Sequence, residues 1–200
     1  MKIFQSTAAA IKEAARIIAE GGIIVYPTDT VYGLGCNPFN EEAVRKIFRI
    51  KGKRTKPLPI LASNVKEIEK IALTTDRTLK FAEKFWPGPL TMVLPKKPSL
   101  PSLVTRDLNS VAVRVPNHKV AFELIRTSGG LLVGTSANKT GKKPSRTAQE
   151  AAKQIGKKVD LIIDDGPTPI GASSTIIDLT QEELRIVRQG PIRLEDILSA

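Results

Sequence analysis

The sequence contains very little cysteine and histidine. Cys36 is the only cysteine among the 200 residues, which excludes an intrachain disulfide and argues against a cysteine-ligated metal site. His118 is the only histidine, so neither a pair of histidine ligands nor a histidine proton relay can form. Because His118 lies in a polar turn before an expected helix, we interpret it as a capping or surface residue. We therefore expect no metal site built by the chain and no imidazole base.

Long apolar segments and aromatic residues are also scarce. The longest apolar candidates, GGIIVYP and GGLLVG, fall far short of the roughly 18 residues of a membrane span, so we expect a soluble, cytoplasmic protein with no membrane partner. Lys12, Glu13 and Arg16 interrupt the N-terminal Ala/Ile run at helical spacing, which favours an amphipathic helix over a signal peptide. Aromatic residues make up 4% of the chain, which argues against a base-stacking surface for nucleic acid.

Two common nucleotide-binding motifs are missing. The segment YGLG at 32–35 lacks the GxGxxG pattern between a strand and a helix, and no GxxxxGK[ST] loop occurs. We therefore interpret YGLG as a turn. If the protein binds a nucleotide, it must do so by another arrangement.

Positive charge, by contrast, is abundant. The chain has 31 Lys and Arg against 20 Asp and Glu, a net charge of +11. Seven of the 12 residues in RKIFRIKGKRTK, at 45–56, are basic. This balance favours polyanionic partners, which leaves both RNA and a nucleoside triphosphate open.

A helix divides this basic run. Asn40 is the expected N-cap, an apolar face follows, and Gly52 comes after the helix end. We expect the first basic residues to lie on the solvated helix surface and the later ones to lie beyond it, where a phosphate pocket can form. The later ones are Lys51, Lys53, Arg54 and Lys56.

Short apolar strands and amphipathic helices follow one another along the chain, and the last three strands are consecutive. This order predicts a single α/β domain over 1–200, with its core at about 7–191 and a twisted mixed β-sheet with flanking helices. The expected strands are 23–27, 57–62, 90–95, 110–116, 131–135, 159–164, 174–180 and 184–190. The expected helices are 6–20, 40–52, 65–72, 76–86, 119–129 and 147–156, with a short helix at the end and an irregular loop at 96–109.

Hydroxyl and cationic side chains gather at the ends of these strands. Each group alone is compatible with turn formation, a salt bridge or surface charge. Because α/β sheets bind ligands beyond their strand ends, the groups together with Lys51, Lys53 and Arg54 predict a site for an anionic ligand. They are Thr28, Thr30, Ser110, Arg114, Ser136, Asn138 and Arg188.

At these residues the sequence resembles the YrdC family, the threonylcarbamoyl-AMP synthases. The matching segments, from about Gly21 to Pro191, are YPTDTVYGLG, IKGKRTKPL, WPGPLT, SVAVRVP, TSAN followed by KPS, STIIDLT and IVRQG. The resemblance implies a concave, positively charged pocket and a nucleotidyltransferase that converts L-threonine, bicarbonate or CO2 and ATP, with Mg2+, into threonylcarbamoyl-AMP and pyrophosphate. It also implies a downstream tRNA threonylcarbamoyl transferase complex, and it leaves weak binding of tRNA or double-stranded RNA open.

The resemblance also implies a role for individual residues. The L-threonine site would be Thr28, Thr30, Arg114 and the backbone of Gly134, with Arg114 on the carboxylate. The ATP site would be Lys51, Lys53, Arg54, Ser110, Ser136, Asn138, Ser145 and Arg188, with Lys51 and Arg54 as the catalytic residues.

The chain departs from the family at two positions. Lys53 stands where the KxR pattern usually has arginine and Arg54 follows it; we favour Arg54 for that role and keep Lys53 as the alternative. Leu61 stands where some members have histidine, so that threonine contact is not carried over. Some relatives have a further C-terminal domain, and we expect any pocket closure here to come from a local loop or to be absent.

The main alternative function is a module that binds double-stranded RNA or tRNA through phosphate contacts, without catalysis. A second alternative is the related carbamoyl-adenylate chemistry of hydrogenase-maturation proteins, whose acylphosphatase-like and zinc-finger-like segments do not occur in this sequence.

Overall fold

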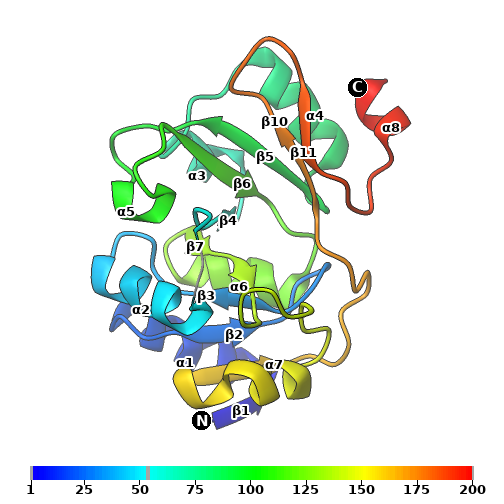
Figure 1. The fold of residues 1–200 in the computed structure, drawn as a ribbon. Helices are drawn as coiled ribbons and strands as arrows, with labels where there is room; N and C mark the ends of the chain where they lie inside the picture. Colours follow the sequence, from blue (N-terminus) through cyan, green and yellow to red (C-terminus); the bar gives the residue numbers. More distant parts are fainter. Residues whose placement is uncertain (1, 53–54, 200) are drawn as a thin grey trace.

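The strands form two mixed β-sheets in the computed structural model, which describes residues 2–52 and 55–199 (Figure 1). The smaller sheet has the order β1 (Lys2–Gln5), β9 (Leu161–Asp164), β2 (Ile24–Tyr26), β3 (Gly33–Gly35) and β8 (Thr135–Ser136). The larger sheet has the order β11 (Arg185–Arg188), β10 (Thr175–Asp178), β5 (Leu90–Pro95), β6 (Ser110–Arg114), β4 (Ile60–Ala62) and β7 (Leu131–Val133). Both sheets contain parallel and antiparallel pairs, which confirms the mixed α/β class, although the strands divide between two sheets where the sequence suggested one.

Helices flank both sheets. Near the smaller sheet lie α1 (Ala8–Ala19), α2 (Glu41–Lys51) and α7 (Ala148–Ile155), and η1 (Gly156–Lys158) follows α7 (Figure 1). Helix α6 (Lys119–Thr127) packs against α1 and against β4 and β7 of the larger sheet. Near the larger sheet lie α3 (Val65–Glu69), α4 (Asp76–Phe85), α5 (Ser102–Thr105) and, beside the C-terminus, α8 (Leu194–Leu198) (Figure 1). In the part of the chain that the structure describes, none of these helices has the length and apolar character needed to cross a membrane.

Several expected element boundaries are confirmed. Strand β5 has the bounds read from the sequence, and Asn40 caps α2 by accepting a hydrogen bond from the amide of Ala43 at 3.0 Å. Helix α2, however, continues through Lys51, which is buried in its last turn, so the expectation that Lys51 lies beyond the helix was wrong. Lys53 and Arg54 lie outside the described residues.

The interpretation of YGLG as a turn was also wrong. Residues Gly33–Gly35 form β3, which pairs antiparallel with β2. A Cβ atom on Gly33 would lie 2.9 Å from the Tyr26 ring, so this strand needs glycine because an aromatic ring packs on its backbone. The glycine content that suggested a turn is thus a packing requirement.

Two further elements were not expected from the sequence. Strand β1 pairs in parallel with β9 although all four of its residues are exposed, so it carries no apolar pattern. Helix α5 forms a single short turn within the loop expected at 96–109.

One segment, 131–136, connects the two sheets. The sequence predicted one strand over 131–135, but β7 lies at the edge of the larger sheet and β8 at the edge of the smaller one. Gly134 lies between them, and its amide donates to the carbonyl oxygen of Pro59 at 2.9 Å. A Cβ atom there would lie 2.3 Å from Cγ of Leu61, so the crossing requires glycine. The hydroxyl of Tyr26, on β2, donates to the carbonyl oxygen of Val133 at 3.0 Å and fastens the crossing to the smaller sheet.

The larger sheet has two chemically different faces. Alternate residues of β5 and β6, among them Met92 and Val113, are fully buried in the main apolar core. The residues between them point to the opposite face, as the two-residue period of a strand requires. Thr91, Ala112 and Arg114 on that face line a cavity.

Candidate active site

A cavity of about 410 Å³ lies where the face of the larger sheet that carries Thr91, Ala112 and Arg114 meets the strand ends of the smaller one. Among the described residues, its walls combine two arginines, one lysine and several hydroxyl groups with an apolar strip. The polar lining residues are Thr28, Thr30, Tyr32, Lys56, Thr91, Arg114, Thr135, Ser136, Ser173, Ser174 and Arg188. The apolar strip includes Val93, Ala112, Ile176 and Val187.

Half of the residues expected from the sequence lie around this cavity. They come from the loop after β2, from β6, from the β7–β8 crossing and from β11, which are far apart in the chain. These residues are Thr28, Thr30, Arg114, Gly134, Ser136 and Arg188. Lys51, Ser110, Asn138 and Ser145 are outside the lining, and their expected roles in ATP binding stay predictions.

Arg114 is the most deeply buried cation of the lining. Its side chain is 5% exposed, and its Nη1 donates to Oδ1 of Asp29 at 2.9 Å, where the carboxylate is 6% exposed. Nη1 also lies 3.4 Å from the carbonyl oxygen of Gly88, and Nη2 donates to Oγ1 of Thr30 at 3.2 Å. A guanidinium has five N–H donors, so Nε–H and one Nη2 hydrogen have no acceptor among residues 2–52 and 55–199.

The two threonines of PTDT form a chain of hydroxyl groups behind Arg114. Oγ1 of Thr28 donates to the carbonyl oxygen of Val31 at 2.7 Å and lies 3.0 Å from Oγ1 of Thr30. Because the single Thr28 hydrogen goes to Val31, the Thr30 hydroxyl donates to Thr28 and accepts from Arg114. Both threonines line the cavity, but their hydroxyls mainly fix the loop and the guanidinium.

Arg188 supplies a second guanidinium at the cavity. Its Nε and Nη2 donate to the carbonyl oxygen of Ser174 at 3.0 and 2.7 Å. Partial burial, and then the nearby positive charge of Arg114, lower the pKa of Arg188. The two guanidiniums therefore repel each other, and a bound anion would relieve this repulsion.

Lys51 and Ser145 support the cavity from behind. The Lys51 ammonium donates to the carbonyl oxygens of Ser136 and Asn138 at 2.6 and 2.7 Å. Oγ of the buried Ser145 donates to the carbonyl oxygen of Ala137 at 2.7 Å. Asn138 donates through Nδ2 to the carbonyl oxygen of Lys142 at 2.6 Å. These three residues hold the loop that carries Ser136.

Ser110 lies on the same face of β6 as the cavity. Residues two apart on a strand share a face, so Ser110 follows the line of Ala112 and Arg114 away from the smaller sheet. It is half-buried. Ser110 is therefore beside the cavity rather than in its wall.

The sequence did not identify several lining residues. Ser173 and Ser174 belong to a Gly/Pro/Ser-rich loop, where serine is common for turn-forming reasons alone. Thr91 alternates with Leu90 and Met92, and this alternation was the available signal that its side chain faces away from the core. Tyr32 was not identified because YGLG was interpreted as a turn. Burial raises its pKa to about 12, so it stays protonated.

His118 does not line the cavity, but its side chain is only 11% exposed, so it is not the surface residue that the sequence suggested. It is the N-cap residue of α6 without a side-chain cap bond, and its Nε2 lies 3.5 Å from Oδ2 of Asp165. Burial lowers its pKa, although Asp165 and Asp29 oppose this effect. The imidazole is therefore neutral at neutral pH. Because it does not line the cavity, it cannot act as a base there.

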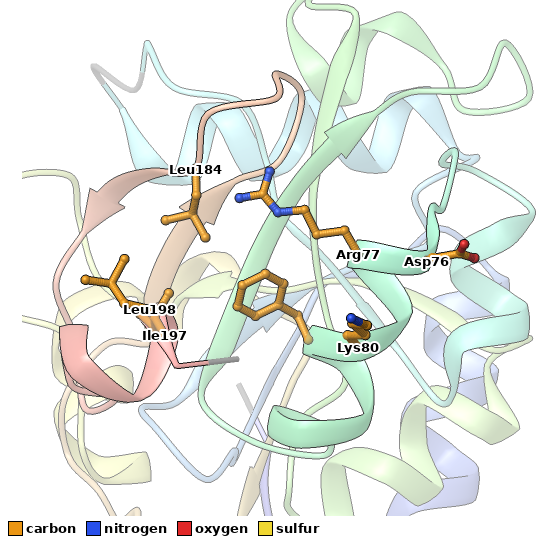
Figure 2. A pocket seen from close by; sticks show the side chains of 7 residues that line it. Asp76, Arg77, Lys80, Leu184, Ile197 and Leu198 are labelled. Atoms are coloured by element: carbon orange, nitrogen blue, oxygen red, sulfur yellow. The ribbon is translucent and has the colours of Figure 1, made fainter.

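A second cavity, of about 310 Å³, lies between α4 and α8 (Figure 2). Figure 2 shows Leu184, Ile197 and Leu198 on one wall and Arg77, on α4, extending toward Leu184. None of the expected site residues that the structure describes lines it. It has no hydroxyl groups in its lining and offers no comparable chemistry.

Comparison with known proteins gives consistent results. A family model described as "Telomere recombination", Sua5/YciO/YrdC, matches residues 16–190. The chain is 41% identical over 189 residues to the threonylcarbamoyl-AMP synthase of Pyrococcus abyssi, which covers 94% of this chain and 56% of the relative. It is 37% identical over 190 residues to the threonylcarbamoyl-AMP synthase of Bacillus subtilis, which covers 94% of this chain and 55% of the relative. The chain thus spans about half the length of these curated relatives.

Among solved structures, P. abyssi Sua5 complexed with L-threonine matches the fold with a TM-score of 0.95 at 38% identity. The match covers 100% of this chain and 60% of that chain.

Lys51 is expected to stabilise the loop around Ser136. The change Lys51→Met keeps the aliphatic stem but leaves at least two buried carbonyl oxygens without their charged donor. We expect the free energy of unfolding to fall by about 3 kcal/mol, measured by urea denaturation. The control is Lys46→Met on the exposed face of the same helix, which should change it by less than about 0.5 kcal/mol. Equal effects of the two changes would show that Lys51 does not hold the loop.

The lowered pKa of His118 predicts that the free energy of unfolding depends on pH. Its pKa in the folded protein lies below the ordinary 6.5, so the unfolded chain takes up the proton more readily. The stability that His118 contributes is complete above pH 6.5 and is lost as the pH falls through the lowered folded value. Urea denaturation at about pH 7.5 and about pH 5.5 should show a smaller loss for His118→Gln than for the unmodified protein. The same loss in both proteins would contradict this assignment.

Proposed function

Because this chain belongs to the Sua5/YciO/YrdC family, we propose that it is a nucleotidyltransferase that forms threonylcarbamoyl-AMP. Its substrates are L-threonine, bicarbonate or CO2, and ATP, and pyrophosphate is the second product. The observation that carries this proposal is the unpaired edge of Arg114 in a cavity that Arg188 also lines.

The Arg114 edge fits an amino-acid carboxylate. Nε–H and an Nη2 hydrogen point in the same direction from one side of a guanidinium, which is the geometry that binds two carboxylate oxygens. Asp29, Thr30 and Gly88 occupy other donors of Arg114. L-Threonine bound at this edge would place its amine toward the rest of the cavity, where Ser136 and Arg188 lie.

The phosphoryl-transfer step needs no strong protein base. Once the threonine amine has combined with CO2, a carbamate oxygen attacks the α-phosphorus of ATP, and the bond from that phosphorus to the oxygen bridging to the β-phosphorus breaks. Pyrophosphate leaves with this electron pair, and the carbamate stays bonded to AMP. Positioning and charge neutralisation supply most of the catalysis in such a transfer. A lining with two arginines, one lysine and several hydroxyls, but no histidine, fits this requirement.

We assign the phosphates of ATP to the side of the cavity that carries Arg188, Lys56 and Ser136. Lys51, Asn138 and Ser145 fix the loop that presents Ser136, so they act on ATP binding through that loop. Ser110 extends the same face of β6. The family's second basic position, Lys53 or Arg54, follows directly after the C-cap Gly52 of α2 in the chain.

Mg2+ fits this proposal as the counter-ion of ATP. The lining includes no Asp or Glu, and residues 2–52 and 55–199 contain no group of three or more His, Cys, Asp or Glu that could hold a metal ion. Magnesium is commonly held by substrate phosphates with few protein ligands. We propose that Mg2+ enters with ATP and neutralises phosphate charge there.

The comparisons favour this proposal over an RNA-binding module without catalysis. The cavity also argues for a small ligand, because Arg114 is buried at 4% exposure and cannot reach a nucleic-acid backbone on the surface. We propose that the product passes to a tRNA threonylcarbamoyl transferase complex.

Pyrophosphate release tests the proposed reaction. Purified protein with ATP, Mg2+ and bicarbonate should release pyrophosphate when L-threonine is present and far less when L-serine replaces it. Arg114→Lys should lower kcat/KM for threonine roughly 100-fold, because lysine cannot bind a carboxylate through two parallel donors.

The matched control is Arg126→Lys. Arg126 is an exposed arginine on α6 that pairs with Glu123, and its replacement should leave the rate unchanged. A lack of threonine-dependent pyrophosphate release by the unmodified protein would refute the proposed function. Equal rates in the two lysine variants would refute the role of Arg114.

A further inference from the structure

Asp29 lies between the two threonines of PTDT but faces away from the proposed substrate site. It is absent from the lining of the 410 Å³ cavity. It instead lines a neighbouring cavity of about 500 Å³, together with Trp86 and Ile170. The Asp29–Arg114 pair therefore forms part of the wall between the two cavities. The Asp29 carboxylate therefore contacts Arg114 and does not contact a substrate bound in the 410 Å³ cavity.

The backbone holds Asp29 in a fixed place. Its carbonyl oxygen accepts a hydrogen bond from the amide of Ile170 at 3.0 Å. The amides of the next two residues, Thr30 and Val31, donate to Oγ1 of the preceding Thr28 at 3.1 and 3.3 Å, which closes a tight turn around Asp29. These hydrogen bonds fix the position of Asp29 in the loop after β2 of the smaller sheet, whereas Arg114 belongs to the larger sheet.

The ion pair has an unusual one-sided geometry. Only Oδ1 of Asp29 contacts the guanidinium, and Oδ2 is buried with no hydrogen-bond partner in the described part of the chain. Buried polar atoms normally find partners, so an unpaired carboxylate oxygen weakens the fold and calls for an explanation. A two-oxygen pair with Asp29 would occupy two parallel donors of Arg114. The one-sided contact holds the guanidinium and leaves Nε–H and an Nη2 hydrogen for another carboxylate.

We propose that Asp29 is a positioning residue that holds Arg114 so that its unpaired edge faces the carboxylate of L-threonine. This inference rests on the proposed function. Thr30 assists by accepting from Nη2, but within residues 2–52 and 55–199 only Asp29 supplies the opposite charge next to the buried guanidinium. Its effect is therefore expected on threonine binding, and only through Arg114.

The test measures the Kd of L-threonine by calorimetry without ATP. Asp29→Asn keeps the size of the side chain and removes its charge, and we expect the Kd to rise about tenfold. The matched control is Asp165→Asn, the same chemical change at a nearby, partly exposed carboxylate that pairs with His118. It should leave the Kd within about twofold of the unmodified protein. Thermal unfolding of both variants establishes that they are folded.

A double-mutant cycle separates positioning from a general loss of structure. In the Arg114→Lys background, Asp29→Asn should change the threonine Kd by less than about twofold, because the group that it positions has been replaced. A persisting tenfold effect in that background would overturn the proposal, as would an unchanged Kd in the single variant. If Asp29→Asn does not fold, Asp29→Glu takes its place in the same cycle, since it keeps the charge but displaces the contact.

The two proposals fail in different ways. If the unmodified protein does not bind L-threonine, the proposed function is wrong and the role of Asp29 falls with it. If the unmodified protein binds L-threonine and Asp29→Asn binds it equally well, only the positioning role is overturned.

Discussion

The buried guanidinium of Arg114 sets the main constraint on this structure. The Arg114 side chain is only 5% exposed. A charged group buried to this extent is tolerated only when an opposite charge and hydrogen-bond acceptors surround it. Arg114 belongs to β6 of the larger sheet, whereas Asp29 and Thr30 follow β2 of the smaller sheet. Satisfying the guanidinium therefore brings the two sheets together at one place. The cavity lies at this junction, so the contact that solves a folding problem also presents the N–H groups of Arg114 to a ligand.

The remaining parts of the site follow from the way in which the two sheets are joined. The chain passes from β7 to β8 at Gly134, and this crossing presents Ser136 to the cavity. The crossing is secured from several directions, by Tyr26 at Val133, by Lys51 at Ser136, and by Ser145 at the next residue. The basic residues at 45–56 thus have different roles in the site. Lys51 organises the loop from behind, while Lys56 reaches the cavity wall.

Much of this arrangement could be predicted from the sequence, because periodicity and capping are local signals. The apolar pattern predicted β5 to the residue, and Asn40 marked the start of α2. The pairing of strands that are far apart in the chain is harder to predict from the sequence. Exposed β1 has no apolar pattern, and β3 is hidden by glycines that the Tyr26 ring requires. At the site, motif resemblance selected Arg114, Arg188 and Ser136. It did not separate residues that line the cavity from Lys51 and Ser145, which support it, because that distinction depends on side-chain direction in the folded chain.

The central claim is that the unpaired edge of Arg114 binds the carboxylate of L-threonine. The most direct test compares the Kd of L-threonine with that of L-threoninol, which keeps the amine and both methyl and hydroxyl groups of the side chain but replaces the carboxylate by an alcohol. A site built around a charged two-donor contact should reject this analogue strongly. L-Threoninol should bind at least about 100-fold more weakly than L-threonine. Equal affinities for the two compounds would contradict it.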